Sequence, residues 1–276
     1  MTPSPVSPRL ANICLHPIKS LDPLPVKEAR IGPGGGLEFD RAWALYSADG
    51  EWVNGKRAAA IFLIRAAFAP DISSVTLSVP GDRRKIPTKT FAFPGDTAPA
   101  SKWFSDFFEQ PITVRHSPGG FPDDAIANGP TIISTASLQA VCGLFPGMAI
   151  DDARLRFRTT LEIDGDRSAV APAEVPAFWE DQLFSAEERS TVRFRIGEVN
   201  FEGSNPCARC PVPPRDPHTG VIIPGFQKIF SDYRRSHIPA WCPEARFDHY
   251  YRLATNTRVA SSEGGKILRV GDLLVL

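Results

Sequence analysis

The sequence predicts a mainly β fold with some α-helix (α+β) that is rich in β-barrel structure. Short segments of strand-like pattern recur along the 276-residue chain, and few segments show the period of a helix. The 27 prolines and 21 glycines are spread along the chain, as expected where turns join many short strands. This pattern favours barrels over a doubly wound sheet.

The first hundred residues are expected to be mostly strand. A glycine-rich turn at 32–36 and a hairpin signal, Ala48-Asp49-Gly50, punctuate apolar stretches of strand length. Strands are therefore predicted over residues 10–18, 25–31, 42–46, 51–54, 75–79 and 90–93.

A change of period follows. Phe104, Phe107 and Phe108 recur at helical spacing, which predicts a helix over 101–108 with Ser101 as its cap. A strand is predicted over 110–117. The polar, turn-rich loop 119–129 is expected to separate two domains, residues 8–118 and 125–276.

The second half mixes strands and helices. A strand over 131–134 leads into a helix that Thr135 caps and that ends near Cys142. Helical segments are predicted over 179–184 and 224–236. Strands are predicted over 157–163 and 192–199, and a strand pair around the Gly271-Asp272 turn over 266–275.

Charge and hydropathy exclude several classes of function. The chain carries 31 Lys and Arg against 31 Asp and Glu, which argues against general nucleic-acid or membrane-surface binding. The N-terminus has no signal-peptide pattern, and the apolar run 58–64 is too short to span a bilayer. We therefore expect a soluble, cytoplasmic protein with no nucleic-acid and no membrane partner.

Residues 201–221 pose the main chemical question, because Cys207 and Cys210 lie three apart in a proline-rich loop. Five cysteines without a framework spacing indicate free thiols. A redox pair normally opens a helix, which prolines at 211, 213 and 214 disfavour. A zinc site would need two more ligands, and the other cysteines and histidines have no zinc-finger spacing. Two loop cysteines without a role stay open as an interpretation.

Cations next to this pair offer another chemistry. Arg209 lies beside Cys210, and Arg215 is close by. Guanidinium groups lower the pKa of a neighbouring thiol and attract anions. A thiolate beside fixed cations could bind a soft metal carried by a phosphorylated ligand.

Two signatures stand far apart in the chain. The first is His16-Pro17-Ile18-Lys19-Ser20 followed by Asp40-Arg41-Ala42-Trp43, and the second is Asn205-Pro206-Cys207-Ala208-Arg209-Cys210 followed by Asp216-Pro217-His218-Thr219-Gly220. With segments 132–138, 156–158 and 270–272, they resemble in order the MOSC family of molybdenum cofactor proteins. The resemblance covers nearly the whole chain and is greatest to the branch with an N-terminal β-barrel domain, which includes the mitochondrial amidoxime-reducing component and its bacterial relatives.

The resemblance implies an N-terminal MOSC-type barrel (8–118), a C-terminal MOSC barrel (125–276) and a molybdenum–molybdopterin cofactor between them. It implies that Cys210 is the catalytic thiolate bound to molybdenum. The lysine, hydroxyl and arginine of the first signature would hold the cofactor's phosphate and pterin. The cofactor-binding residues implied are Lys19, Ser20, Arg41, Asp123, Arg158, Thr160 and Arg209.

Some positions depart from the family pattern. Thr160 stands where the family has an asparagine, and Lys56-Arg57 stands where it has an arginine-glutamine pair. Residues 247–250 lack a family glycine, so the geometry on the substrate side is expected to differ. No plant-type run of clustered cysteines is present, which predicts a chain without an iron–sulfur centre.

The function implied is a molybdenum-dependent reductase of N-hydroxylated or N-oxidised small molecules. Its electrons would come from an external donor, such as a flavin reductase or a small haem or iron–sulfur protein. The alternative is a carrier of the cofactor or of sulfur, as in the MOSC domains of sulfurases, with a persulfide on Cys210. A vestigial domain that binds little is a third reading.

Overall fold

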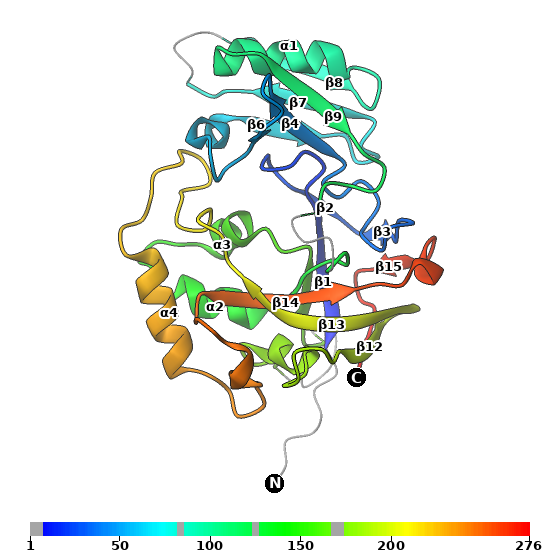
Figure 1. The fold of residues 1–276 in the computed structure, drawn as a ribbon, viewed down its shortest axis with the longest axis vertical. Helices are drawn as coiled ribbons and strands as arrows, with labels where there is room; N and C mark the ends of the chain where they lie inside the picture. Colours follow the sequence, from blue (N-terminus) through cyan, green and yellow to red (C-terminus); the bar gives the residue numbers. More distant parts are fainter. Residues whose placement is uncertain (1–7, 82–85, 123–126, 167–173) are drawn as a thin grey trace.

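The computed structural model describes residues 8–81, 86–122, 127–166 and 174–276. Its largest feature is an eight-stranded sheet in the order β16-β12-β13-β14-β10-β11-β1-β2 (Figure 1). The strands come from both ends of the chain: β1 (Arg9–Leu15), β2 (Leu24–Val26), β10 (Ile132–Ser134), β11 (Leu161–Asp164), β12 (Val192–Ile196), β13 (Val199–Ala208), β14 (Arg252–Arg258) and β16 (Leu274–Val275).

Backbone hydrogen bonds close this sheet into a barrel. The Leu10 N–H donates to the Asp272 carbonyl over 2.8 Å, and the Gly271 N–H donates to the Leu10 carbonyl over 2.7 Å. The Leu274 N–H donates to the Pro8 carbonyl over 2.8 Å. The start of β1 therefore lies between β11 and the segment that leads into β16, and closure leaves the barrel without long free edges. The barrel-rich α+β prediction is confirmed.

Smaller sheets form the part drawn above the barrel in Figure 1. One joins β4 (Trp43–Ser47) to β5 (Trp52–Val53) and β9 (Ile112–His116), and another joins β6 (Arg65–Phe68), β7 (Ser74–Ser78) and β8 (Lys89–Ala92). Helix α1 (Thr97–Phe108) buries Trp103, Phe104 and Phe107. A two-stranded sheet pairs β3 (Glu28–Arg30) with β15 (Ile267–Arg269). One apolar core, from Leu10 and Phe201 to Trp43 and Phe104, runs through both parts.

Three helices pack against the barrel around a second core. They are α2 (Thr135–Cys142), α3 (Ile150–Phe157) and α4 (Phe226–Ser236). Leu138, Phe157, Phe226 and Phe230 are buried there together. The ring centroids of Phe157 and Phe230 are 6.0 Å apart, so α3 and α4 meet through aromatic contact.

The predicted strand over 157–163 was wrong in its first half. Helix α3 extends to Phe157, and β11 begins only at Leu161. Ala153 and Phe157 lie four residues apart, so both face the second core from one side of a helix. Arg158 has a φ of +51°, the left-handed conformation that ends the helix. This short helix was missed because charged residues separate the few apolar positions, Ile150, Ala153 and Phe157, that face the second core.

Both predicted helix caps were wrong. α1 begins at Thr97, so Ser101 lies inside it and its hydroxyl donates to the Thr97 carbonyl over 2.6 Å. Ser134, not Thr135, caps α2 by accepting from the Ser137 N–H over 3.2 Å. The apolar periodicity located each helix but not its first residue.

Pairing differs from expectation at several strands. The two terminal strands do not pair with each other, because β15 pairs with β3 and β16 with β12. Strands β6, β13 and β14 were not predicted, and residues 201–208 belong to β13 rather than to a loop. The division into 8–118 and 125–276 stays a prediction, although β1 lies in the first range and pairs with β11 of the second.

Within the described residues, no helix combines the length and apolarity that crossing a membrane would require.

Candidate functional site

A cavity of about 470 Å³ is lined by residues from both halves of the sequence. This volume lies within the range of about 300–1,000 Å³ typical of small-molecule and cofactor sites. We call it the central pocket. The predicted site residues that line it are Lys19, Ser20, Arg41, Arg158, Thr160, Arg209 and Cys210. Asp123 lies outside the described residues.

Two register shifts along β13 bring the cysteine motif to the pocket. Pairing with β14 is irregular between Gly203 and Asn205 and again between Pro206 and Ala208. Each extra residue re-aims the side chains that follow it. Asn205 and Cys207 therefore line the pocket from the strand, and Cys210 lines it from the loop that follows.

The two cysteines differ in their partners. Arg209 Nη1 lies 3.1 Å from Cys207 Sγ, and its Nη2 donates to the Phe157 carbonyl. Within the described residues, Cys210 Sγ has no hydrogen-bond partner, although it is only half-buried. The sequence had suggested that Arg209 acts beside Cys210, whereas its guanidinium contacts the other sulfur. Cys210 therefore lines the pocket without a contact between its sulfur and a cation among the described residues.

Arg41 and Asp40 form an ion pair in the pocket wall. Arg41 has a φ of +53°, and its Nη2 also donates to the Arg158 carbonyl over 3.3 Å. Burial raises the pKa of the Asp40 carboxyl, but the Arg41 guanidinium and hydrogen bonding to His16 outweigh it and lower that pKa to about 2. Asp40 is therefore ionised and fixes Arg41 in place.

His16 lies behind this pair, fully buried. Its N–H donates to Asp40 Oδ1 over 2.8 Å, and its ring nitrogens have no hydrogen-bond partner within the described residues. Burial, followed by repulsion from Arg158, lowers the pKa of His16 to about 3. The ring is therefore neutral at physiological pH and packs in the interior of the protein.

Within the described residues, the buried polar atoms of the pocket that have no hydrogen-bond partner are Thr160 Oγ1 and the Nε atoms of Arg156 and Arg209, and the half-buried Arg158 lies close to Thr160 in the sequence. Burial and the neighbouring Arg41 charge lower the pKa of the Arg158 guanidinium to about 10. No hydrogen bond from this guanidinium is found among the described residues. Thr160 is 1% exposed, and its Oγ1 likewise has no partner in that part of the chain. Buried polar groups normally find partners, so these groups indicate a bound polar ligand.

Lys19 and Ser20 lie on the side formed by the N-terminal half. Lys19 Nζ donates to the Phe121 carbonyl over 3.1 Å and lies 3.7 Å from the centroid of the Trp52 ring. Ser20, with a φ of +74°, accepts from the Gly55 N–H through its hydroxyl over 3.2 Å. Both residues are thus held in place by the hairpin of β4 and β5 and the residues that follow it.

Several residues that line the pocket or hold its cations were not predicted. Trp52 supports Lys19, while Asn54, Asn128, Asn205 and Asn256 line the pocket itself. Asn256 could have been found only by predicting β14, because it follows three buried residues of that strand. Lys56 lines the pocket at one of the positions that depart from the family pattern.

Residues 7–111 match the family model described as the MOSC N-terminal beta barrel domain. No curated protein matches the chain.

Proposed function

We propose that the central pocket binds a molybdenum cofactor. The proposal rests first on the match of residues 7–111 to the MOSC N-terminal beta barrel domain, which places the chain with the MOSC-domain proteins. We propose further that the protein is a reductase of N-hydroxylated or N-oxidised small molecules. One observation supports this most directly. Seven of the predicted site residues, far apart in the sequence, line one pocket together with polar groups that have no partner among the described residues.

The donor set of the pocket fits such a cofactor. Lys19, Arg41, Arg158 and Arg209 line it together, and these cations suit a phosphorylated ligand. Two cysteine thiols line the same pocket and supply the sulfur that a soft metal prefers. The unpartnered Thr160 hydroxyl suits a ligand that makes hydrogen bonds rather than one held by charge alone.

The residues that line the pocket would have different roles in holding the cofactor. Lys19, Ser20 and Arg41 would hold the phosphate end, where Asp40 and Trp52 already fix the cations. Arg158 and Thr160 would donate to polar atoms of the pterin. Cys210 would bind the metal, because its sulfur has no hydrogen-bond partner in the described part of the chain and Cys207 is engaged with Arg209. The cofactor, when bound, would supply reversible two-electron chemistry.

The net reaction needs an outside source of electrons. Reduction of an N–OH group takes two electrons and two protons, breaks the N–O bond, forms an N–H bond and releases water. We propose that a separate flavin reductase, or a small haem or iron–sulfur protein, delivers the electrons. Proteins of this kind are expected to dock only transiently.

The first experiment is metal analysis of protein expressed in a host that makes the cofactor. We expect about one molybdenum and one pterin per chain, because a thiolate and a preformed cation set hold the group at once. Cys210→Ser is expected to lose the metal, while Cys207→Ser largely keeps it. Equal retention in both variants would rule out Cys210 as the ligand.

A turnover assay distinguishes a reductase from a carrier of the cofactor. Loaded protein is assayed with benzamidoxime and a chemical reductant, and in parallel it is mixed with a cofactor-free molybdenum enzyme. Turnover of the amidoxime supports the reductase. Transfer of cofactor without turnover supports the alternative, a carrier of the cofactor or of sulfur.

A further inference from the structure

The end of α3 carries three arginines at alternate positions, and each contacts a different part of the protein. Arg154 binds Glu162 on the neighbouring strand β11. Arg156 and Arg158 both line the central pocket. Arg156, between Arg154 and Arg158, also contacts the loop that follows Cys210. Arg154 is accounted for by the fold and Arg158 by the proposed cofactor site, whereas neither accounts for the loop contacts of Arg156.

Arg156 is 5% exposed and has three contacts with this loop. Its Nη1 donates to the Pro213 carbonyl over 3.1 Å and also to the Arg215 carbonyl. Its Nη2 lies 3.6 Å from Asp216 Oδ2. A single guanidinium thus spans four residues of the cysteine loop, which we define as residues 209–223.

The composition of the cysteine loop explains why a side chain is needed there. Pro211, Pro213 and Pro214 have no N–H, so this stretch cannot form a regular strand ladder or helical turn. Its backbone bonds are local: the Arg215 N–H donates to the Val212 carbonyl and the Ile223 N–H to the Pro214 carbonyl, each over 2.9 Å. The buried guanidinium supplies the missing donors.

Cys210 lies between two anchors. Before it, the Arg209 N–H donates to the Tyr251 carbonyl over 3.0 Å and ties the end of β13 to the residue before β14. After it, the Val212 carbonyl accepts from the Arg215 N–H within the loop, and among the described residues the first carbonyl held from outside the loop is that of Pro213, by Arg156. Pro211 is restricted by its ring, and Val212 is partly buried against the first core. The position of the Cys210 sulfur therefore depends on Arg156.

We infer that Arg156 is a positioning residue that holds the cysteine loop so that the Cys210 sulfur faces the central pocket. The role of that sulfur as a metal ligand rests on the proposed function. The positioning itself does not, and it can be measured without metal. Because Arg156 acts through the loop carbonyls, its planar fork matters as well as its charge.

The test measures the rate at which iodoacetamide alkylates each cysteine in metal-free protein, by mass spectrometry of the two cysteine peptides. In Arg156→Met we expect alkylation of Cys210 to rise about tenfold, because hydrogen bonds from a charged donor are lost and the loop opens. Cys207, on strand β13, should change less than twofold. A nearby positive charge favours the reactive thiolate, so loss of charge alone would slow alkylation, and an acceleration would show that the loop has moved.

Arg158→Met is the matched control. It removes the same charge from the same helix end but contacts the loop through no hydrogen bond among the described residues. We expect neither cysteine to react faster there than in wild type, because loss of charge alone slows alkylation. Arg156→Lys keeps the charge without the fork, and about a threefold rise at Cys210 is expected. If Arg156→Met does not fold, Arg156→Lys is the variant that is compared with wild type.

Two results would overturn the inference: an unchanged Cys210 rate in the Arg156 variants, or equal acceleration of Cys207 and Cys210, which would report general loosening. Molybdenum content provides the second readout. If the proposed function holds, Arg156→Met should retain several-fold less metal than wild type, with partial recovery in Arg156→Lys. Wild-type protein without metal would count against the proposed function and leave the alkylation result intact.

Discussion

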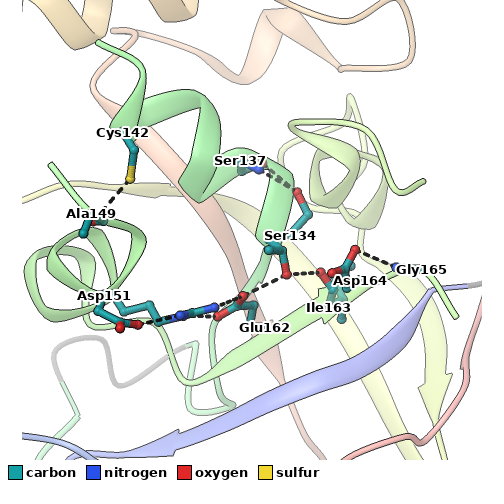
Figure 2. A network of polar contacts seen from close by, with 11 residues as sticks. Ser134, Ser137, Cys142, Ala149, Asp151, Glu162, Ile163, Asp164 and Gly165 are labelled. Atoms are coloured by element: carbon teal, nitrogen blue, oxygen red, sulfur yellow. Dashed lines mark hydrogen bonds and ion pairs between the residues drawn. The ribbon is translucent and has the colours of Figure 1, made fainter. Parts of the chain in front are cut away.

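Two polar clusters meet around the end of α3, and they differ in whether the protein satisfies their polar atoms. In the first, which we call the Glu162 network, Arg154 donates to Glu162 through Nε over 2.8 Å and Nη2 over 2.7 Å, and to Asp151 through Nη1 over 2.6 Å. Thr135 donates to Glu162 over 2.8 Å. Figure 2 shows Asp151 and Glu162 within this network. In the second, the central pocket, the Thr160 hydroxyl and the Nε atom of Arg209 have no hydrogen-bond partner in the described part of the chain.

This difference in hydrogen bonding distinguishes polar groups that stabilise the fold from polar groups that are available to bind a ligand. A buried carboxylate with three charged or hydroxyl hydrogen bonds is compensated for its loss of water. A buried hydroxyl or guanidinium without partners lowers stability unless something binds it. Chemically similar residues, within a few positions in the sequence, should therefore respond in opposite ways to substitution.

The largest effect is expected in the Glu162 network. Arg154→Met leaves the Glu162 carboxylate, 4% exposed, with only the Thr135 hydroxyl as a side-chain partner. Breaking a buried pair from one side should lower the free energy of unfolding by about 3 kcal/mol, as measured by urea denaturation. The double variant with Glu162→Met should recover much of this loss, because no unpaired charge is then left. A loss below about 1 kcal/mol would mean that the network is not structural.

A smaller, pH-dependent effect is expected at Glu180, which is fully buried but does not line the central pocket. Burial, followed by repulsion from Asp181, raises the pKa of Glu180 from its usual value of 4.5 to about 7. Its contribution to stability is therefore complete below pH 4.5 and is lost as pH rises to about 7. At pH 8 the ionised carboxylate accepts from the Ser134 N–H and the Ser137 hydroxyl, both neutral donors.

Glu180→Gln should therefore raise the free energy of unfolding at pH 8 by about 2 kcal/mol, with little change at pH 4.5. Urea denaturation at the two pH values measures this difference. The matched substitution Glu162→Gln should destabilise at pH 8, because Glu162 is paired with a guanidinium. A Glu180→Gln gain of the same size at both pH values would show that Glu180 does not titrate in this range.

Much of the architecture was predictable because local patterns determine it. The strand-like stretches of the first half and the apolar stripe of α4 are confirmed at nearly the predicted residues. What failed depends on long-range pairing. Nothing local in residues 267–275 shows that β15 and β16 pair with different partners, or that the first strand of the chain helps to close the barrel.

The site was predictable in its members but not in its contacts. The resemblance named residues that prove to line one pocket, yet it could not show that Arg209 contacts Cys207 or that Asp40 fixes Arg41. These depend on register shifts in β13 and on left-handed residues such as Arg41, which tertiary packing decides. The role inferred for Arg156 was likewise not visible in the sequence, because its partners are backbone carbonyls of a loop.

The finest comparison removes one hydroxyl from each cluster. Thr135→Val deletes the donor to Glu162 Oε1 and should cost about 1.5 kcal/mol of unfolding free energy, since hydrogen bonds to charged groups contribute about 1.5–3 kcal/mol. Thr160→Val removes a hydroxyl that has no partner among the described residues, so metal-free protein should be unchanged or more stable by up to about 1 kcal/mol. Both side chains are nearly fully buried, which makes the substitutions comparable. Urea denaturation measures both free energies of unfolding. Equal losses in the two variants would mean that the Thr160 hydroxyl already has a hydrogen-bond partner in the protein, and that the protein satisfies the polar groups of the pocket as fully as those of the Glu162 network.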